Sequence, residues 1–184
     1  SAPMVVITDV NGTGAVATPN LGSVSGGIRK FVDSMAGLTY DGRNNLNQYI
    51  PIAVPDVTSF PGSDYYEIEL GQYTEKLHSD LPPTTLRGYR QTNTTDATVS
   101  QFHSLGPLII AKRNTPVRIK FTNNLSTGRD GDLFIPVDES VMGAGMGPKD
   151  SMGMDCDPSM GDVCEKYTQN RATLHLHGGF VPWI

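Results

Sequence analysis

The sequence predicts an all-β domain, either an antiparallel sandwich or a barrel. Its 184 residues include 20 glycines and 13 prolines, which favour short strands joined by turns over long helices. A hydrophobic content of 38% is enough to form a core. From residue 64 onward, short segments with strand character follow one another without a helical pattern between them, which is typical of all-β folds.

Five segments carry this strand character. Residues 66–70 alternate apolar and charged side chains, as a half-buried strand does, and residues 116–122 alternate strictly before the turn residues Asn123 and Asn124. The remaining three segments are 84–89, 108–111 and 172–177.

The chain divides into an extension and a domain. Residues 1–63 show little sustained periodicity, and we expect an irregular N-terminal extension that packs over the surface of something larger. Residues 64–184 form the predicted domain. Within it, residues 126–170 make a polar insertion rich in Met, Gly and Asp, and loops of this length are functional or disordered more often than not.

Charge and hydropathy exclude two classes of partner. A net charge of −5 without a basic stripe argues against nucleic acid. No apolar run approaches ~18 residues, so we expect no membrane span. The first residues, Ser1-Ala2-Pro3, do not begin a signal peptide, so the chain was either never exported or has been processed.

The cysteines favour export. Cys156 and Cys164 lie close together in the insertion, and this spacing predicts a local disulfide in an oxidising compartment. Sequons at Asn11, Asn93 and Asn124 would permit N-glycosylation in a eukaryotic secretory route. We therefore expect a secreted or otherwise exported protein.

The pattern that carries chemistry is TLHLHGG at residues 173–179. In a β-strand His175 and His177 point to the same face, with Cα atoms roughly 6.5–7 Å apart. Neutral imidazole binds copper, zinc, iron and nickel, and the two glycines allow backbone or ligand to approach closely. The motif therefore predicts a metal site.

Other proteins use the same pair on a strand. A cupin needs a glutamate soon after the second histidine, and residues 178–184 contain none. A zinc carbonic anhydrase needs a third histidine beyond the last residue of this chain. A structural alternative is that backbone carbonyls satisfy both imidazoles.

Six segments of the sequence are informative because of the order in which they occur. They are YEI at 66–68, KLHSDLPPTTLRGY at 76–89, GP at 106–107, RN at 113–114, VRIKFTNNL at 117–125 and LHLHGG at 174–179. Together they resemble the bacterial laccase group of multicopper oxidases, which includes spore-coat laccases, bilirubin oxidases and phenoxazinone synthase. The resemblance covers about residues 64–184, and it is much more specific than the histidine pair alone.

The resemblance implies a cupredoxin-like Greek-key β-barrel, of which this chain would hold an incomplete first domain. It further implies oxidation of a small substrate one electron at a time at a type 1 copper, and reduction of dioxygen to water at a trinuclear cluster. His175 and His177 would supply one ligand to the type 2 copper and one to a type 3 copper.

The chain departs from the family because three further His-x-His motifs and the type 1 ligands are absent. We therefore expect the remainder of the oxidase, including the type 1 copper, in further polypeptide. The alternative is a non-catalytic copper-binding cupredoxin-like module. The reducing substrate stays open.

Other candidate residues have two interpretations. Five of the seven methionines lie in the insertion. Their thioether sulfurs would suit Cu(I) in an auxiliary copper site. The alternative is that the segment is a flexible insertion that binds no metal. His78 is expected to make a structural hydrogen bond in a turn, and His103 to be exposed. The five methionines are Met142, Met146, Met152, Met154 and Met160.

Overall fold

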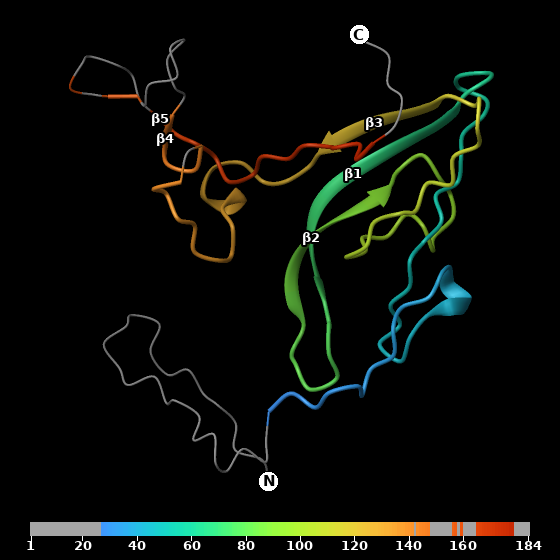
Figure 1. The fold of residues 1–184 in the computed structure, drawn as a ribbon, viewed down its shortest axis with the longest axis horizontal. Coiled ribbons are helices and arrows are strands. Elements are labelled where there is room, and N and C mark those ends of the chain that lie inside the picture. The colour runs from blue at the N-terminus through green and yellow to red at the C-terminus, as the bar shows by residue number, and fades with distance from the viewer. Residues whose placement is uncertain (1–26, 142, 148–155, 158, 160–164, 179–184) are drawn as a thin grey trace.

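A computed structural model describes residues 27–141, 143–147, 156–157, 159 and 165–178. Strands are the main regular structure in this part of the chain, which otherwise consists of loops with short 3-10 turns (Figure 1). The predicted all-β class is confirmed. The elements are η1 (Tyr40–Gly42), β1 (Asp64–Glu75), β2 (Thr84–Gln91), β3 (Val117–Asn123), η2 (Gly128–Gly131), β4 (Met146–Gly147) and β5 (Glu165–Lys166).

The main sheet has three strands in the order β2-β1-β3. β1 and β2 form an antiparallel hairpin, in which Gly71 lies opposite Gly88. β3 runs parallel to β1, with Phe121 opposite Ile68. The expectation of a purely antiparallel fold is therefore wrong for this pair. A parallel pair needs a long crossover connection, and residues 76–116, which include β2, provide it.

Two predicted strands do not form in the described part of the chain. Residues 108–111 make only an isolated bridge, between Leu108 and Ile52. Residues 172–177 do not form a strand. A strand exists only where another strand completes its hydrogen-bond ladder, and no described strand does so here.

The core lies against β1, whose alternating pattern was predicted. Tyr66 and Ile68 are buried with Ala53, and Tyr89 and Phe121 from the neighbouring strands pack against them. Burying such apolar surface is the main favourable term in folding. Ala53 precedes residue 64, so the predicted extension contributes a side chain to this cluster. The division of the chain at residues 63 and 64 stays a prediction.

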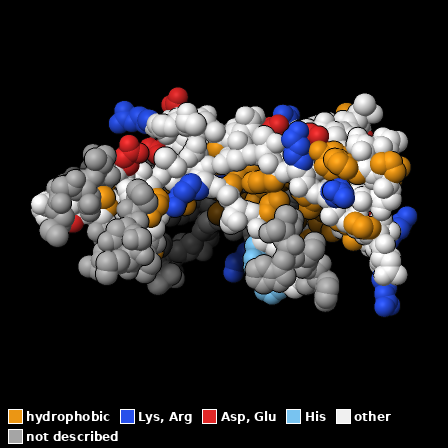
Figure 2. All heavy atoms as spheres, turned by 90° about the horizontal axis from the view of Figure 1, so that it is seen from above, with side chains coloured by type: hydrophobic (Ala, Val, Ile, Leu, Met, Phe, Trp, Pro, Cys, Tyr) orange, Lys and Arg blue, Asp and Glu red, His pale blue; other side chains and the backbone are white. Residues whose placement is uncertain are grey.

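Both sheets are open. The second sheet pairs only β4 with β5, two residues each. β3 is largely exposed along its length, and Val117 and Ile119 are 37% and 44% exposed. Figure 2 shows hydrophobic side chains gathered on the surface of the molecule. Open edges and exposed apolar side chains are consistent with an incomplete all-β cupredoxin-like domain.

None of the helices in the described residues has the length and apolar character that crossing a bilayer requires.

Candidate metal centre

Both histidines of the predicted site lie in a segment that we call the histidine segment, residues 169–178. The ring centroids of His175 and His177 are 5.8 Å apart and their planes are nearly perpendicular, at 85°. Both side chains are exposed, and neither ring makes a hydrogen bond to another described residue. Their nitrogens are therefore available to a ligand. Whether they bind a metal stays a prediction.

The residue before His175 faces a cavity beside the main sheet. Leu174 lines an apolar cavity of about 270 Å³ together with Ile119 of β3, Tyr89 of β2 and Ile68 of β1. Leu174 and these strand residues therefore face one shared cavity, although Leu174 itself is 49% exposed.

Polar contacts hold the start of the segment. The guanidinium of Arg87 donates from Nη1 to the carbonyl of Gln169 (2.6 Å) and from Nη2 to the carbonyl of Gly131 (2.8 Å). At the end of β3, Asn123 donates from Nδ2 to the carbonyl of Asn170 (2.6 Å). Neither Arg87 nor Asn123 was singled out from the sequence, because their partners lie far along the chain.

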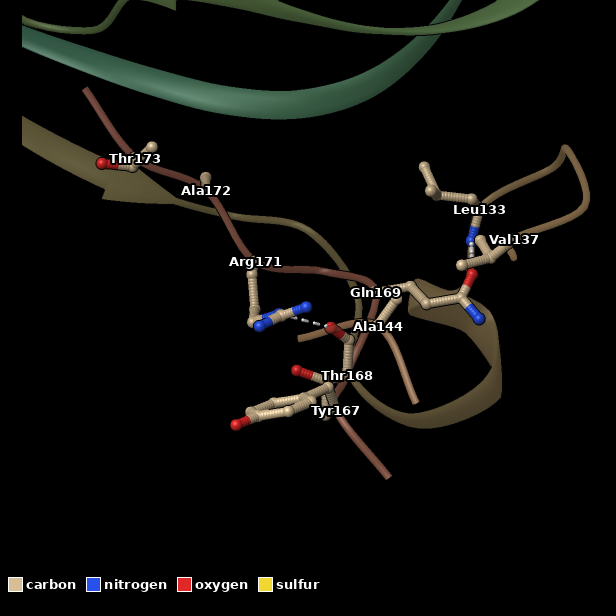
Figure 3. Close-up of a pocket in the computed structure, with 9 residues that line it drawn as sticks. All are labelled: Leu133, Val137, Ala144, Tyr167, Thr168, Gln169, Arg171, Ala172 and Thr173. Atoms are coloured by element: carbon tan, nitrogen blue, oxygen red, sulfur yellow. Dashed lines mark hydrogen bonds between the residues drawn. The ribbon is translucent and has the colours of Figure 1, made fainter. Parts of the chain in front are cut away.

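A second cavity of about 310 Å³ adjoins the segment (Figure 3). The Arg171 guanidinium on its wall donates to the carbonyls of Thr168 (2.8 Å) and Gly143 (2.5 Å), and it lies 4.7 Å from the ring centroid of Tyr167. The lining contains no imidazole, thiol or carboxylate. The cavity is therefore a poor candidate for a metal. Its lining residues are Leu133, Val137, Ala144, Tyr167, Thr168, Gln169, Arg171, Ala172 and Thr173.

The donor set fits copper in kind. Imidazole nitrogen is a favoured copper ligand, and two exposed rings of one short segment can serve one ion or two neighbouring ions. Within the described residues no group of three or more His, Cys, Asp or Glu side chains is placed to hold a metal. His175 and His177 would therefore need ligands from elsewhere to complete a centre.

His78 has the structural role that the sequence predicts. Its Nδ1 accepts the backbone N–H of Asp80 (3.0 Å), so the proton lies on Nε2, which donates to the carbonyl of Arg29 (2.8 Å). The ring closes the turn after β1. The prediction of a structural hydrogen bond is confirmed.

His103 is not exposed, and that expectation is wrong. The residue is 7% exposed, and its ring meets the Tyr49 ring edge-to-face at 4.6 Å. Its backbone N–H donates to the carbonyl of Tyr89 (3.3 Å), which draws the loop against β2. Burial lowers the pKa of the imidazole.

Several predictions fall outside the described residues. Cys164 is one of these, so the disulfide with Cys156 stays a prediction. Of the five methionines in the insertion, only Met146 is described, so both interpretations of that group also stay open.

Comparison with known proteins finds similarity to three laccases. The laccase of Bacillus subtilis (strain 168) is 28% identical over 155 residues, which cover 84% of this chain and 21% of the relative. The laccase of Bacillus stratosphericus is 29% identical over the same shares. That of Haloferax volcanii is 32% identical over 97 residues, 50% of this chain and 14% of the relative. The chain resembles laccases.

The resemblance to laccase-like multicopper oxidases, first seen in six segments of the sequence, is thus confirmed. The chain spans about a fifth of the length of the two Bacillus laccases, at 21% of each. No protein-family model matches it, and no solved structure matches it.

Proposed function

We propose that this chain is the N-terminal portion of a laccase-like multicopper oxidase. The whole enzyme would oxidise a small reducing substrate one electron at a time and reduce dioxygen to water. The observation that carries the proposal is the pair of exposed imidazoles, whose ring centroids are 5.8 Å apart. They stand in a chain that is 28% identical to a laccase over 84% of its length. The open sheets give further support, because they leave room for more of the fold.

His175 and His177 are the residues that we assign to the centre. Each would direct one ring nitrogen to copper, one toward the type 2 ion and one toward a type 3 ion of a trinuclear cluster. Copper, when bound, supplies the one-electron redox chemistry. The task of this chain is to hold two neutral imidazoles in place. Protons compete with metal for these nitrogens, so copper affinity should fall in acid.

The remaining ligands and the type 1 copper would come from the rest of the same oxidase. An extracytoplasmic location is part of the proposal, because a disulfide between Cys156 and Cys164 persists only in an oxidising compartment. The partners would be dioxygen and a small reducing substrate.

Copper titration of the full-length polypeptide, with and without each substitution, tests the two ligands. We expect His175→Ala and His177→Ala each to weaken Cu(II) affinity by roughly tenfold or more, because each removes one of only two imidazoles in the segment. Calorimetry and electron paramagnetic resonance would measure the change. Thr173→Ala is the matched control, since Thr173 is exposed in the same segment and its substitution leaves both imidazoles in place. Equal affinities for all four proteins would contradict the assignment.

The alternative function is a non-catalytic copper-binding module. Copper stoichiometry and oxygen uptake with a phenol, measured on the full-length polypeptide, separate the two. An oxidase should carry several coppers and consume oxygen, and His175→Ala should stop this uptake while leaving any blue colour. A single copper without oxygen uptake would favour the module.

A further inference from the structure

Arg87 connects three parts of the molecule. It lies in the middle of β2, opposite Gln72 of β1, and it is half-buried. Its two terminal nitrogens donate to carbonyls that lie 82 and 44 residues away, at Gln169 and Gly131. A guanidinium is planar and its donors form a rigid fork, so two such bonds fix direction as well as distance.

A second side chain acts at the adjoining peptide. Asn123, the last residue of β3, donates to the carbonyl of Asn170, and the Asn170 amide donates in turn to the carbonyl of Ser126 (3.0 Å). Two strands of the main sheet therefore hold consecutive carbonyls of one short stretch. We call Gln169 and Asn170 the anchor.

Few other contacts hold the histidine segment after the anchor. From Ala172 to Gly178, no backbone hydrogen bond to another described residue occurs, and every residue is exposed. Leu174 lines an apolar cavity together with residues of the sheet and is 49% exposed. The positions of His175 and His177 therefore depend on where the anchor is held.

We propose that Arg87 is a positioning residue for the copper ligands, which sets the location of His175 and His177 by holding the anchor against the sheet. The inference rests on the proposed function, because it assumes that the two histidines bind copper. The hydrogen bonds of the Arg87 guanidinium go to the carbonyls of Gln169 and Gly131, and neither involves an imidazole. Groups that orient metal ligands from a distance commonly affect metal affinity when they are substituted.

The test compares arginines on one strand. Arg87→Ala removes both donors to the anchor region, and we expect it to weaken Cu(II) affinity by roughly tenfold, the lower end for substitutions that disturb ligand orientation. Arg90→Ala is the matched control: Arg90 is also on β2, and its Nε, like that of Arg87, is buried and lacks a partner among described residues. Its guanidinium donates to Glu69 of β1 (2.9 Å), away from the histidine segment.

Three readouts separate positioning from simple stability. Thermal unfolding should fall for both variants, whereas copper affinity should fall only for Arg87→Ala. The electron paramagnetic resonance signal of the type 2 Cu(II) should change for Arg87→Ala, because the imidazole assigned to that ion would be displaced, and it should stay unchanged for Arg90→Ala. Arg87→Lys should restore only part of the affinity, because an ammonium cannot reproduce the planar fork.

The possible failures are distinguishable. If copper binding to the wild-type chain is insensitive to His175→Ala, the proposed function fails and the inference fails with it. If binding depends on the histidines but Arg87→Ala matches Arg90→Ala in affinity, only the inference is overturned. Should Arg87→Ala not fold, Asn123→Ala removes the side-chain donor to Asn170, while the Leu133 N–H that donates to the Gln169 side chain (2.8 Å) stays in place. Weakened copper binding by folded Asn123→Ala supports the anchor, and unchanged binding overturns it.

Discussion

The β1–β2 hairpin and the histidine segment are built in opposite ways. In the hairpin, residues 68–75 pair one by one with residues 84–91, and Ile68 and Leu70 are buried. The segment from Arg171 to Gly178 is exposed throughout and has no strand partner among the described residues. Stability should therefore reside in the hairpin, and ligand binding in a segment held at a few points. Functional segments are often drawn from such weakly held parts of a protein.

The largest expected effect tests the hairpin side of this comparison. Tyr66 is 1% exposed at the centre of the core. We expect Tyr66→Ala to lower the free energy of unfolding by about 3–5 kcal/mol, because it leaves a cavity where an aromatic ring was packed. Urea unfolding measures the change.

The control for this substitution is Phe31→Ala. Phe31 is 99% exposed, so its truncation should change stability by no more than about 0.5 kcal/mol. Equal losses for the two variants would show that the core does not lie where Tyr66 places it.

A smaller effect tests how residues before β1 join the hairpin. Gln91 is fully buried at 0% exposure, and its amide both donates to the carbonyl of Val54 (2.6 Å) and accepts its N–H (2.9 Å). Gln91→Leu keeps the approximate size of the side chain but leaves these backbone groups without their partner. We expect a loss of about 1–3 kcal/mol in unfolding free energy.

Gln101→Leu is the matched control for that change, since Gln101 is exposed. It should alter stability by no more than about 0.5 kcal/mol. If Gln91→Leu is as mild as the control, the reciprocal contact with Val54 contributes little, and residues before β1 are joined to the hairpin by apolar packing alone.

The same contrast explains which elements the sequence could predict. The strands at 66–70 and 116–122 were found because apolar and polar side chains alternate along them, and the strand at 84–89 was found from its composition. The segments 108–111 and 172–177 have similar composition but lack a partner strand in the described residues. Strand formation depends on that partner, and the local sequence does not encode it.

Long-range contacts were the other missing information. His103 looks exposed in its polar loop, yet packing on Tyr49 buries it. Arg87 lies in a segment that matched the family, but its partners are 44 and 82 residues away. The histidine pair was found because its chemistry lies in two residues of one short motif. The residues proposed to position it are scattered along the chain.

The smallest expected effect is a dependence of the unfolding free energy on pH, and it again concerns residues that pack with the hairpin. Burial lowers the pKa of His103, while the charge of Glu75 and a hydrogen bond with the Thr98 backbone act more weakly in the opposite direction. In the unfolded chain the histidine pKa is about 6.5. As the pH falls through that value, the unfolded state takes up a proton that the folded state does not, so stability falls. Urea unfolding between about pH 7 and about pH 5 should reveal this loss, the window in which histidine titrates.

Two variants sharpen the measurement. His103→Phe removes the titrating group and should flatten the dependence of stability on pH across this window, since Phe has no proton to gain. Glu75→Gln removes the charge that favours the protonated imidazole, so the loss of stability in acid should become larger than in the wild type. If His103→Phe loses as much stability in acid as the wild-type chain, the proton uptake belongs to another group, and burial of His103 is not the source of the acid sensitivity.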